Sequence, residues 1–170
     1  QSDKPRMLWE KAKDLIAMLP MDKMTKSLVQ TAVAQLNVLS KTVETLRTQM
    51  IELAEKLPEY PVVIAMNGVG ATLASQLIAE IGDITRFPRR GSLTAFAGVD
   101  PGAKQSGTMQ LRSNKISKAG SPHLRRALFQ IVSGLLMRAP DDPVYNFMAK
   151  KRSEGKPYYV YMTAGANKFL

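Results

Sequence analysis

Apolar residues recur at heptad spacing along the segment 21–57, which contains neither glycine nor proline. One register of this repeat holds Val29, Leu36, Val43, Met50 and Leu57, and the other holds Ala32, Leu39, Leu46 and Leu53. A stripe of this kind, about four heptads long, predicts one long helix whose seam lies against another helix. That helix belongs either to the same chain or to a second copy, and we favour a second copy because the seam is continuous.

Shorter helical patterns surround this segment. An amphipathic helix is predicted over 4–18, and further helices are predicted over 71–81, 92–97, 122–138, 143–153 and from 157 onward. Ser92 and Ser121 are the predicted N-caps of two of these helices, since a hydroxyl oxygen accepts well at that position. The stretch 98–117 is less regular, and there we predict a loop with a short hairpin around 108–112.

These elements predict a mainly α protein, with a long coiled-coil helix followed by a small helical domain that contains a helix-hairpin-helix. Pro58 ends the heptad pattern, so we expect a helical and coiled-coil segment at 1–60 and a C-terminal domain at 61–170. The chain has 170 residues, of which 45% are hydrophobic. That is enough to build a core, so disorder throughout is not expected.

Composition removes several classes of function. The chain has no cysteine and one histidine, His123, so disulfides, Cys-ligated zinc, iron–sulfur clusters and His-rich metal sites are excluded. We expect no metal site and no cofactor in this chain. No apolar run approaches the ~18 residues of a membrane span and no signal peptide is evident, so we expect a cytoplasmic protein without a membrane partner.

The positive charge is concentrated in one part of the chain. The formal net charge is +10, and the segment 86–126 holds nine basic residues but only one acidic residue, Asp100. A solvated face usually mixes both signs, whereas a one-signed cluster in glycine-containing loops is typical of a surface that binds phosphates. Nucleic acid is therefore the expected partner, and a basic surface without a specific ligand is the alternative.

The sequence Gly68-Val69-Gly70 lies between two helical patterns. In a helix-hairpin-helix, glycines let the backbone approach a phosphate, and the amides at the second helix's N-terminus bind it. The same pattern also fits a tight turn between packed helices, and both readings stay open.

Few residues offer nucleophilic or acid–base chemistry. His123 follows Pro122 at a predicted helix start, where capping or phosphate contact is as plausible as catalysis. The carboxylates Glu80, Asp83 and Asp100 show no metal-binding spacing, although a fold can gather them. Ser106 precedes a glycine in a predicted loop with Lys104 and Arg112 nearby. Such cations can stabilise the negative charge of the transition state when a hydroxyl attacks a phosphate. From the residue types alone, however, a serine that only forms part of a turn is favoured.

Several short motifs in a fixed order resemble one known family. They are Asn67-Gly68-Val69-Gly70, Glu80-Ile81-Gly82-Asp83 with Arg86-Phe87, Leu93 to Pro101, Gln105-Ser106-Gly107, Ile116 to Gly120 and Leu124 to Leu128. Together they are similar to the C-terminal domain of the IS-one-ten-type transposases, from about residue 62 to the end. The long helix before them resembles the coiled coil of that family.

The resemblance implies a serine recombinase chemistry on DNA. Ser106 matches the family's serine nucleophile, which forms a phosphoserine link to DNA. The residues expected to hold the DNA strand are Gly68, Gly70, Lys104, Arg112, Lys115, Lys118, Arg125 and Arg126. One of the adjacent pair Arg125 and Arg126 is open to a structural role instead, because the two face about 100° apart on a helix.

The family also has an N-terminal resolvase-like domain with four metal-binding acidic residues. This chain has neither that strand pattern nor that acidic quartet, so we expect it to be part of a longer transposase whose Mg²⁺ site lies elsewhere. We expect the 170 residues to bind nucleic acid without recombining it, and to form a homodimer or higher homo-oligomer. A guide RNA is a further partner that the resemblance allows. The alternatives are a non-catalytic nucleic-acid-binding and dimerisation module and a helical assembly protein.

Overall fold

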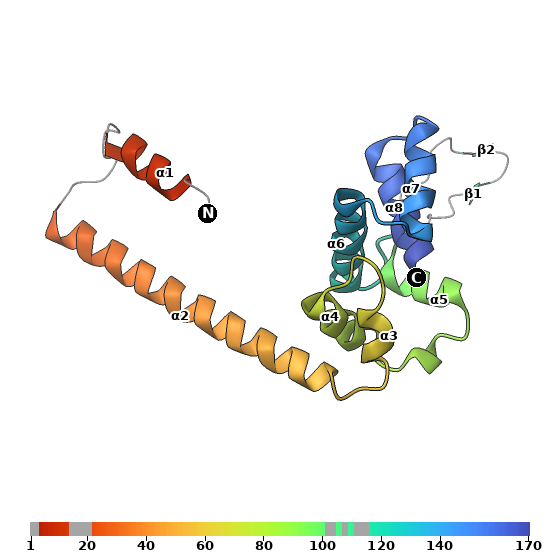
Figure 1. Ribbon diagram of the computed structural model, residues 1–170, viewed down its shortest axis with the longest axis horizontal. Helices are drawn as coiled ribbons and strands as arrows, with labels where there is room; N and C mark the ends of the chain where they lie inside the picture. The colour runs from red at the N-terminus through yellow and green to blue at the C-terminus, as the bar shows by residue number, and fades with distance from the viewer. Residues whose placement is uncertain (1–3, 14–21, 101–104, 107–108, 111–115) are drawn as a thin grey trace. The chain divides into compact units, whose positions relative to one another are not determined.

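The computed structural model describes residues 4–13, 22–100, 105, 106, 109, 110 and 116–170. Its elements are α1 (Lys4–Lys13), α2 (Lys23–Ala54), α3 (Tyr60–Ile64), α4 (Ala71–Ile81), η1 (Ile84–Arg86), α5 (Arg90–Ala97), β1 (Gln105–Ser106), β2 (Met109–Gln110), α6 (Pro122–Arg138), α7 (Pro143–Ser153) and α8 (Tyr158–Phe169) (Figure 1). The predicted mainly α class is confirmed. The chain divides into two compact units, Gln1–Leu46 and Arg47–Leu170.

The heptad segment forms one continuous helix, α2, as its pattern predicts. The helix starts after Asp22, whose carboxylate accepts a hydrogen bond from the Thr25 amide at 2.6 Å. Leu36 and Leu39 are 65% and 64% exposed, and Ala54 is the single residue of this helix that is buried. The stripe therefore has no cover among the described residues, and its pairing with a second copy stays a prediction.

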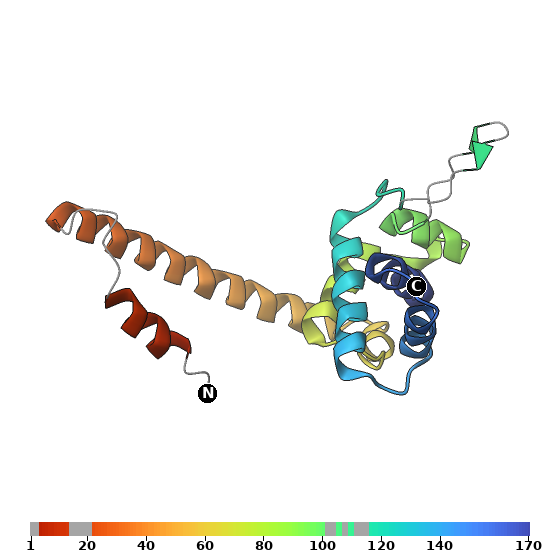
Figure 2. The same ribbon diagram turned by 90° about the horizontal axis from the view of Figure 1, so that it is seen from above.

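The core of the second unit is built around α6. The helix buries one face, with Leu124, Leu128, Ile131 and Leu135 each at most 1% exposed. Helices α4, α5, α7 and α8 all contact it. Figures 1 and 2 both show α6, α7 and α8 side by side, with the C-terminal end of α8 beside α5. Burying large aliphatic side chains at this density accounts for most of the stabilisation of such a small bundle.

The ends of the helices are mostly where the capping residues indicate. Ser121 caps α6, because its Oγ accepts a hydrogen bond from the Leu124 amide at 3.1 Å. Asp142 caps α7 through the amides of Val144 and Tyr145, at 2.7 and 3.1 Å. The Ser92 N-cap prediction is wrong. Helix α5 starts two residues earlier, at Arg90, and its N-cap is Arg89, which has no side-chain cap hydrogen bond.

Helices α3 and α4 flank the predicted glycine turn. Gly68 has φ 82°, in the left-handed region that favours glycine. A side chain there would meet Leu135 Cγ at 3.0 Å and the Ile131 carbonyl oxygen at 3.1 Å, both on α6. At Gly70, by contrast, no atom lies within 4 Å of a side-chain position. The glycine at 68 is therefore explained by packing, while Gly70 lies at the exposed N-terminus of α4.

Candidate nucleic-acid interface

Ser106 lies in a two-stranded antiparallel hairpin. Strand β1 pairs with β2 so that Gln105 is opposite Gln110 and Ser106 is opposite Met109. The hairpin predicted around 108–112 therefore exists, but it starts three residues earlier. Lys104, Arg112 and Lys115 lie outside the described residues, as do the side chains of the hairpin itself.

Both ends of the segment that carries Ser106 are fixed to the helical core. The Ser117 amide donates to the Asp100 carbonyl at 2.9 Å, and the Lys118 amide donates to the Gly98 carbonyl at 3.2 Å. The Ser117 hydroxyl also donates to the Asp100 carboxylate. These contacts anchor the segment between the C-terminus of α5 and the N-terminus of α6.

A groove of about 1400 Å³ runs along α6 and α8. Val99, Ile116 and Lys118 line it, and they flank the segment 101–115 on both sides. The described lining residues include five basic side chains and no acidic one, and the basic set is Arg90, Lys118, Arg125, Arg126 and Lys168. A concave surface with one sign of charge focuses its field on a polyanion, so phosphates are the favoured occupants.

The two adjacent arginines lie in different surroundings, as the open alternative allowed. Arg125 is half-buried, and its Nη1 donates to the Ala97 carbonyl at 3.1 Å, which ties α6 to the end of α5. Arg126 is exposed and makes no hydrogen bond or ion pair with any described residue. The phosphate-binding prediction is therefore better supported for Arg126 than for Arg125.

The remaining groove cations differ in the same way. Arg90 donates to the carbonyl oxygen of Asn167, in the last turn of α8, and Lys168 Nζ lies 5.8 Å from the centre of the Phe147 ring. The Lys118 side chain is exposed and has no hydrogen-bond or ion-pair partner among the described residues. Its backbone adopts φ 55°, which a residue with a side chain rarely holds. Strained backbone of this kind gathers at functional sites.

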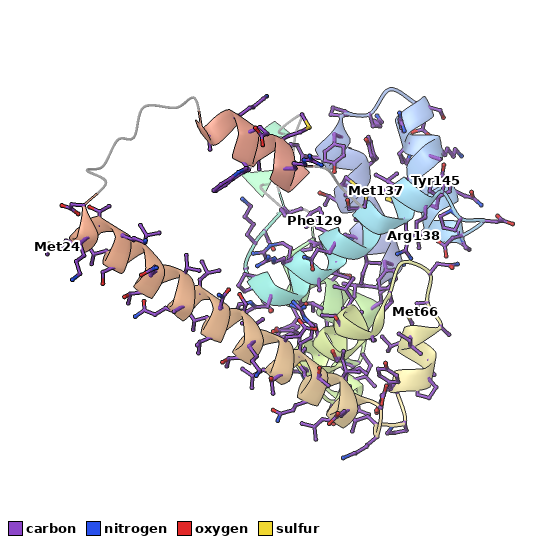
Figure 3. The ribbon with its side chains drawn as sticks, turned by 60° about the vertical axis from the view of Figure 1, so that its left-hand side comes forward. Met24, Met66, Phe129, Met137, Arg138 and Tyr145 are labelled. Atoms are coloured by element: carbon purple, nitrogen blue, oxygen red, sulfur yellow. The ribbon has the colours of Figure 1, made fainter. Side chains whose placement is uncertain are left out.

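The structure brings together only part of the predicted site. Lys118, Arg125 and Arg126 share the groove, whereas Gly68 and Gly70 do not line it. The aromatic lining of the groove was not predicted from the sequence, and it comprises Phe129, Phe147, Tyr158 and Tyr159. Phe129 shares α6 with Met137, another lining residue (Figure 3). The adjacent pair Tyr158-Tyr159 was the available signal, since aromatics among basic residues are typical of nucleic-acid surfaces.

The carboxylates considered from sequence serve structural contacts. Glu80 Oε2 accepts from the Ser121 hydroxyl at 2.7 Å, and Asp100 accepts from Ser117. Asp83 caps η1, and the hydroxyl and then the amide of Thr85 hold its pKa below the usual range. Within the described part of the chain, no three histidine or carboxylate side chains gather to hold a metal ion. The three acidic residues considered from sequence are thus separately engaged.

His123 is exposed in the first turn of α6, directly after Pro122. No helix among the described residues is both long and apolar enough to cross a bilayer.

Comparison with known proteins places this chain in a family. Residues 61–147, about half of the chain, match the family described as Transposase IS116/IS110/IS902. The chain is also 32% identical over 113 residues to an uncharacterised 43.6 kDa protein of insertion element IS110 from Streptomyces coelicolor. That match covers 66% of this chain and 27% of the relative, so the chain spans about a quarter of it. The chain belongs to the IS116/IS110/IS902 transposase family.

Proposed function

We propose that this chain is the part of a transposase that holds the DNA strand and supplies a serine nucleophile, Ser106. One observation carries the proposal. The segment that contains Ser106 leaves and rejoins the core at the edge of a groove whose described charges are all positive. A phosphodiester bound in the groove would therefore lie next to the segment.

The proposed reaction is a transfer of a phosphoryl group between hydroxyls. The Ser106 oxygen attacks phosphorus, a P–O bond to the serine forms, and the P–O bond to one DNA strand breaks with release of that strand's hydroxyl. The serine proton passes to a base, and the leaving oxygen takes up a proton. Attack by a different strand's hydroxyl then reverses the steps and joins new partners without loss of bond energy. Cations such as Lys118 and Arg126 stabilise the charge on phosphorus.

Mg²⁺ is expected for the full-length enzyme, where it would neutralise charge on the phosphate. The described residues do not fit a magnesium site, since Glu80, Asp83 and Asp100 are each engaged in structural contacts. We therefore assign the metal to a part of the transposase outside these 170 residues. The 170-residue chain alone binds DNA and does not exchange strands.

A covalent-adduct assay tests the proposal. Full-length transposase carrying this chain is incubated with Mg²⁺ and end-labelled donor DNA, and the products are separated on a denaturing gel. Wild type gives a protein–DNA adduct, and Ser106→Ala gives none. Ser133→Ala is the matched control, because Ser133 lines the groove and is not the proposed nucleophile. DNA cleavage without any adduct would contradict the serine mechanism and favour direct hydrolysis.

A second candidate function is a module that binds nucleic acid and dimerises without catalysis. The exposed stripe of α2 favours it, because a stripe with Leu36 and Leu39 more than 60% exposed calls for a partner helix. A homodimer through this helix is also compatible with the catalytic proposal. The adduct assay separates the two functions, since a non-catalytic module gives the same products with serine or alanine at position 106.

A further inference from the structure

The groove along α6 and α8 has two chemically different ends. At one end, Arg90 donates to the carbonyl oxygen of Asn167 in the last turn of α8. Arg125, in the first turn of α6, donates to the Ala97 carbonyl at the end of α5. Tyr158 and Tyr159 stand at the opposite end of α8, about 12 to 14 Å from Asn167 along the helix axis at 1.5 Å per residue. One end therefore suits phosphates, while the other presents aromatic rings.

The aromatic end is held in place by the core. Tyr161 is 9% exposed, and its ring centre lies 5.4 Å from that of Tyr158 in an edge-to-face contact. Tyr158 in turn makes an edge-to-face contact with Tyr159 at 5.3 Å. Ring pairs in this geometry attract each other and lose little freedom on binding a ligand. The outermost ring, Tyr159, is thus presented on a supported row.

The same end leaves a large apolar surface uncovered. Met137 is 80% exposed and Tyr159 is 79% exposed, and both line the groove. Surface aromatics usually occur singly, whereas this cluster continues into a groove with five described cations. Rings at one end of the groove and phosphate-binding cations at the other match the two chemical parts of a nucleic-acid strand, its bases and its phosphates.

We propose that this end of the groove binds the unpaired bases of single-stranded DNA, with Tyr159 stacking on a base while Lys118 and Arg126 contact the phosphates. Duplex DNA hides its base faces, so a ring can stack only on a base that has left the helix. An acidic protein would satisfy the cations but would leave the aromatic row without a matching partner. The proposal rests on the proposed function for the choice of DNA, and it adds the strandedness of the substrate.

Fluorescence anisotropy on the full 170-residue chain tests the proposal. The probes are labelled oligothymidine of about 16 nucleotides, a duplex of the same length, and oligouridine. Wild type binds the single strand more tightly than the duplex. Tyr159→Ala and Tyr159→Leu weaken binding to the single strand about tenfold and leave duplex binding unchanged, because both remove the ring that stacks on a base. The leucine variant keeps apolar bulk without a ring, so it separates stacking from simple burial. Tyr159→Phe retains wild-type affinity.

Arginine variants separate the phosphate contact from the stacking contact. Arg126→Ala weakens binding to both DNA forms and lowers the slope of log affinity against log salt by about one. Arg152→Ala is the matched control, because Arg152 is also an exposed helical arginine but does not line the groove. Unchanged thermal melts confirm that each exposed substitution leaves the fold intact.

Four results would overturn the inference. Equal binding of single strand and duplex, or no effect of Tyr159→Ala, would show that the rings do not stack on bases. Tighter binding of oligouridine than of oligothymidine would show that the groove prefers single-stranded RNA to DNA. Loss of self-association in Tyr159→Ala, with DNA binding unchanged, would make the surface a protein interface. The Ser106 adduct assay tests the proposed function independently of these binding measurements. The proposed function and the single-strand inference can therefore fail separately.

Discussion

Helices α2 and α6 both repeat apolar residues at helical spacing, but the structure uses the two stripes differently. Helix α6 buries six of its residues, and α2, nearly twice as long, buries only Ala54. The neighbours of α6 come from four helices that follow or precede it in the same unit. An apolar stripe therefore shows that a helix needs a cover, and says nothing about which molecule provides it.

The exposed stripe of α2 carries a free-energy cost that association would relieve. Covering one leucine gains about 1.5–3 kcal/mol, and the heptad registers of α2 hold several leucines more than half exposed, Leu36, Leu39, Leu46 and Leu53. A second copy would present an identical stripe in a symmetric pair.

The largest effect is expected from shortening two leucines of the α2 seam. Leu39→Ala with Leu46→Ala removes four buried leucines from a symmetric dimer, so the dimer weakens by at least about 4 kcal/mol, roughly a thousandfold in Kd. Sedimentation equilibrium of the 170-residue chain measures this loss.

The reciprocal control lies on α6. Leu128 is fully buried, so Leu128→Ala lowers the free energy of unfolding of the second unit by about 2–5 kcal/mol in urea, while the affinity of the α2 pair is unchanged. If the α2 double variant destabilised the second unit to a similar degree, the two stripes would not differ as the structure indicates.

The next effect concerns the glycine turn that covers the C-terminal half of α6. Gly68→Ala forces a side chain into a left-handed position 3.0 Å from Leu135 Cγ, so we expect a loss of about 2 kcal/mol in unfolding free energy. Gly70→Ala meets no atom within 4 Å and costs less than about 1 kcal/mol.

These glycine variants also separate packing from phosphate binding. Gly70→Ala is expected to weaken DNA affinity if the amides of α4 contact a phosphate, and filter binding at low salt measures the change. Equal unfolding free energies for the two variants would contradict the packing role of Gly68.

A smaller effect distinguishes the adjacent arginines at the start of α6. Arg125→Ala removes the hydrogen bond to the Ala97 carbonyl and lowers the unfolding free energy by about 1.5 kcal/mol. Arg126→Ala changes it by no more than about 0.5 kcal/mol, because that side chain is exposed. Thermal and urea denaturation compare the pair, and a stability loss confined to Arg126→Ala would reverse the assignment.

The smallest effect is the acid sensitivity of the contact between the glycine turn and α7. Burial raises the pKa of Asp142, but the Asn67 amide and the amides of Tyr145 and Val144 outweigh it and hold the pKa below the usual range. A lowered pKa stabilises the folded state at neutral pH, and that contribution is lost as the pH falls below about 4.

Urea denaturation of wild type and Asp142→Asn at pH 7 and pH 3 measures this contribution. Wild type is expected to be the more stable protein at pH 7, with the difference shrinking at pH 3. A difference that grows in acid would contradict the direction of the pKa shift.

Much of the helical framework was predictable, because local chemistry fixes it. Ser121 and Pro122 specify the start of α6, and the spacing of Leu124, Leu128 and Ile131 specifies its inner face. The early start of α5 was not predictable, since no side chain caps it and its position depends on packing of Leu93 and Ala97. Propensity is a weak guide where tertiary contacts decide a boundary.

The sequence by itself determined that this protein is helical, basic between residues 86 and 126, and similar to a transposase domain. Only the tertiary structure decided which basic side chains are available to contact a phosphate. Arg125 and Arg126 are neighbours of the same type, but one bonds to the end of α5 while the other faces a groove. It also placed Tyr159 and Arg126, more than thirty residues apart in the chain, in the lining of one groove. The physical reason is that charge and periodicity are properties of the chain, whereas burial and proximity arise only when helices distant in sequence pack together.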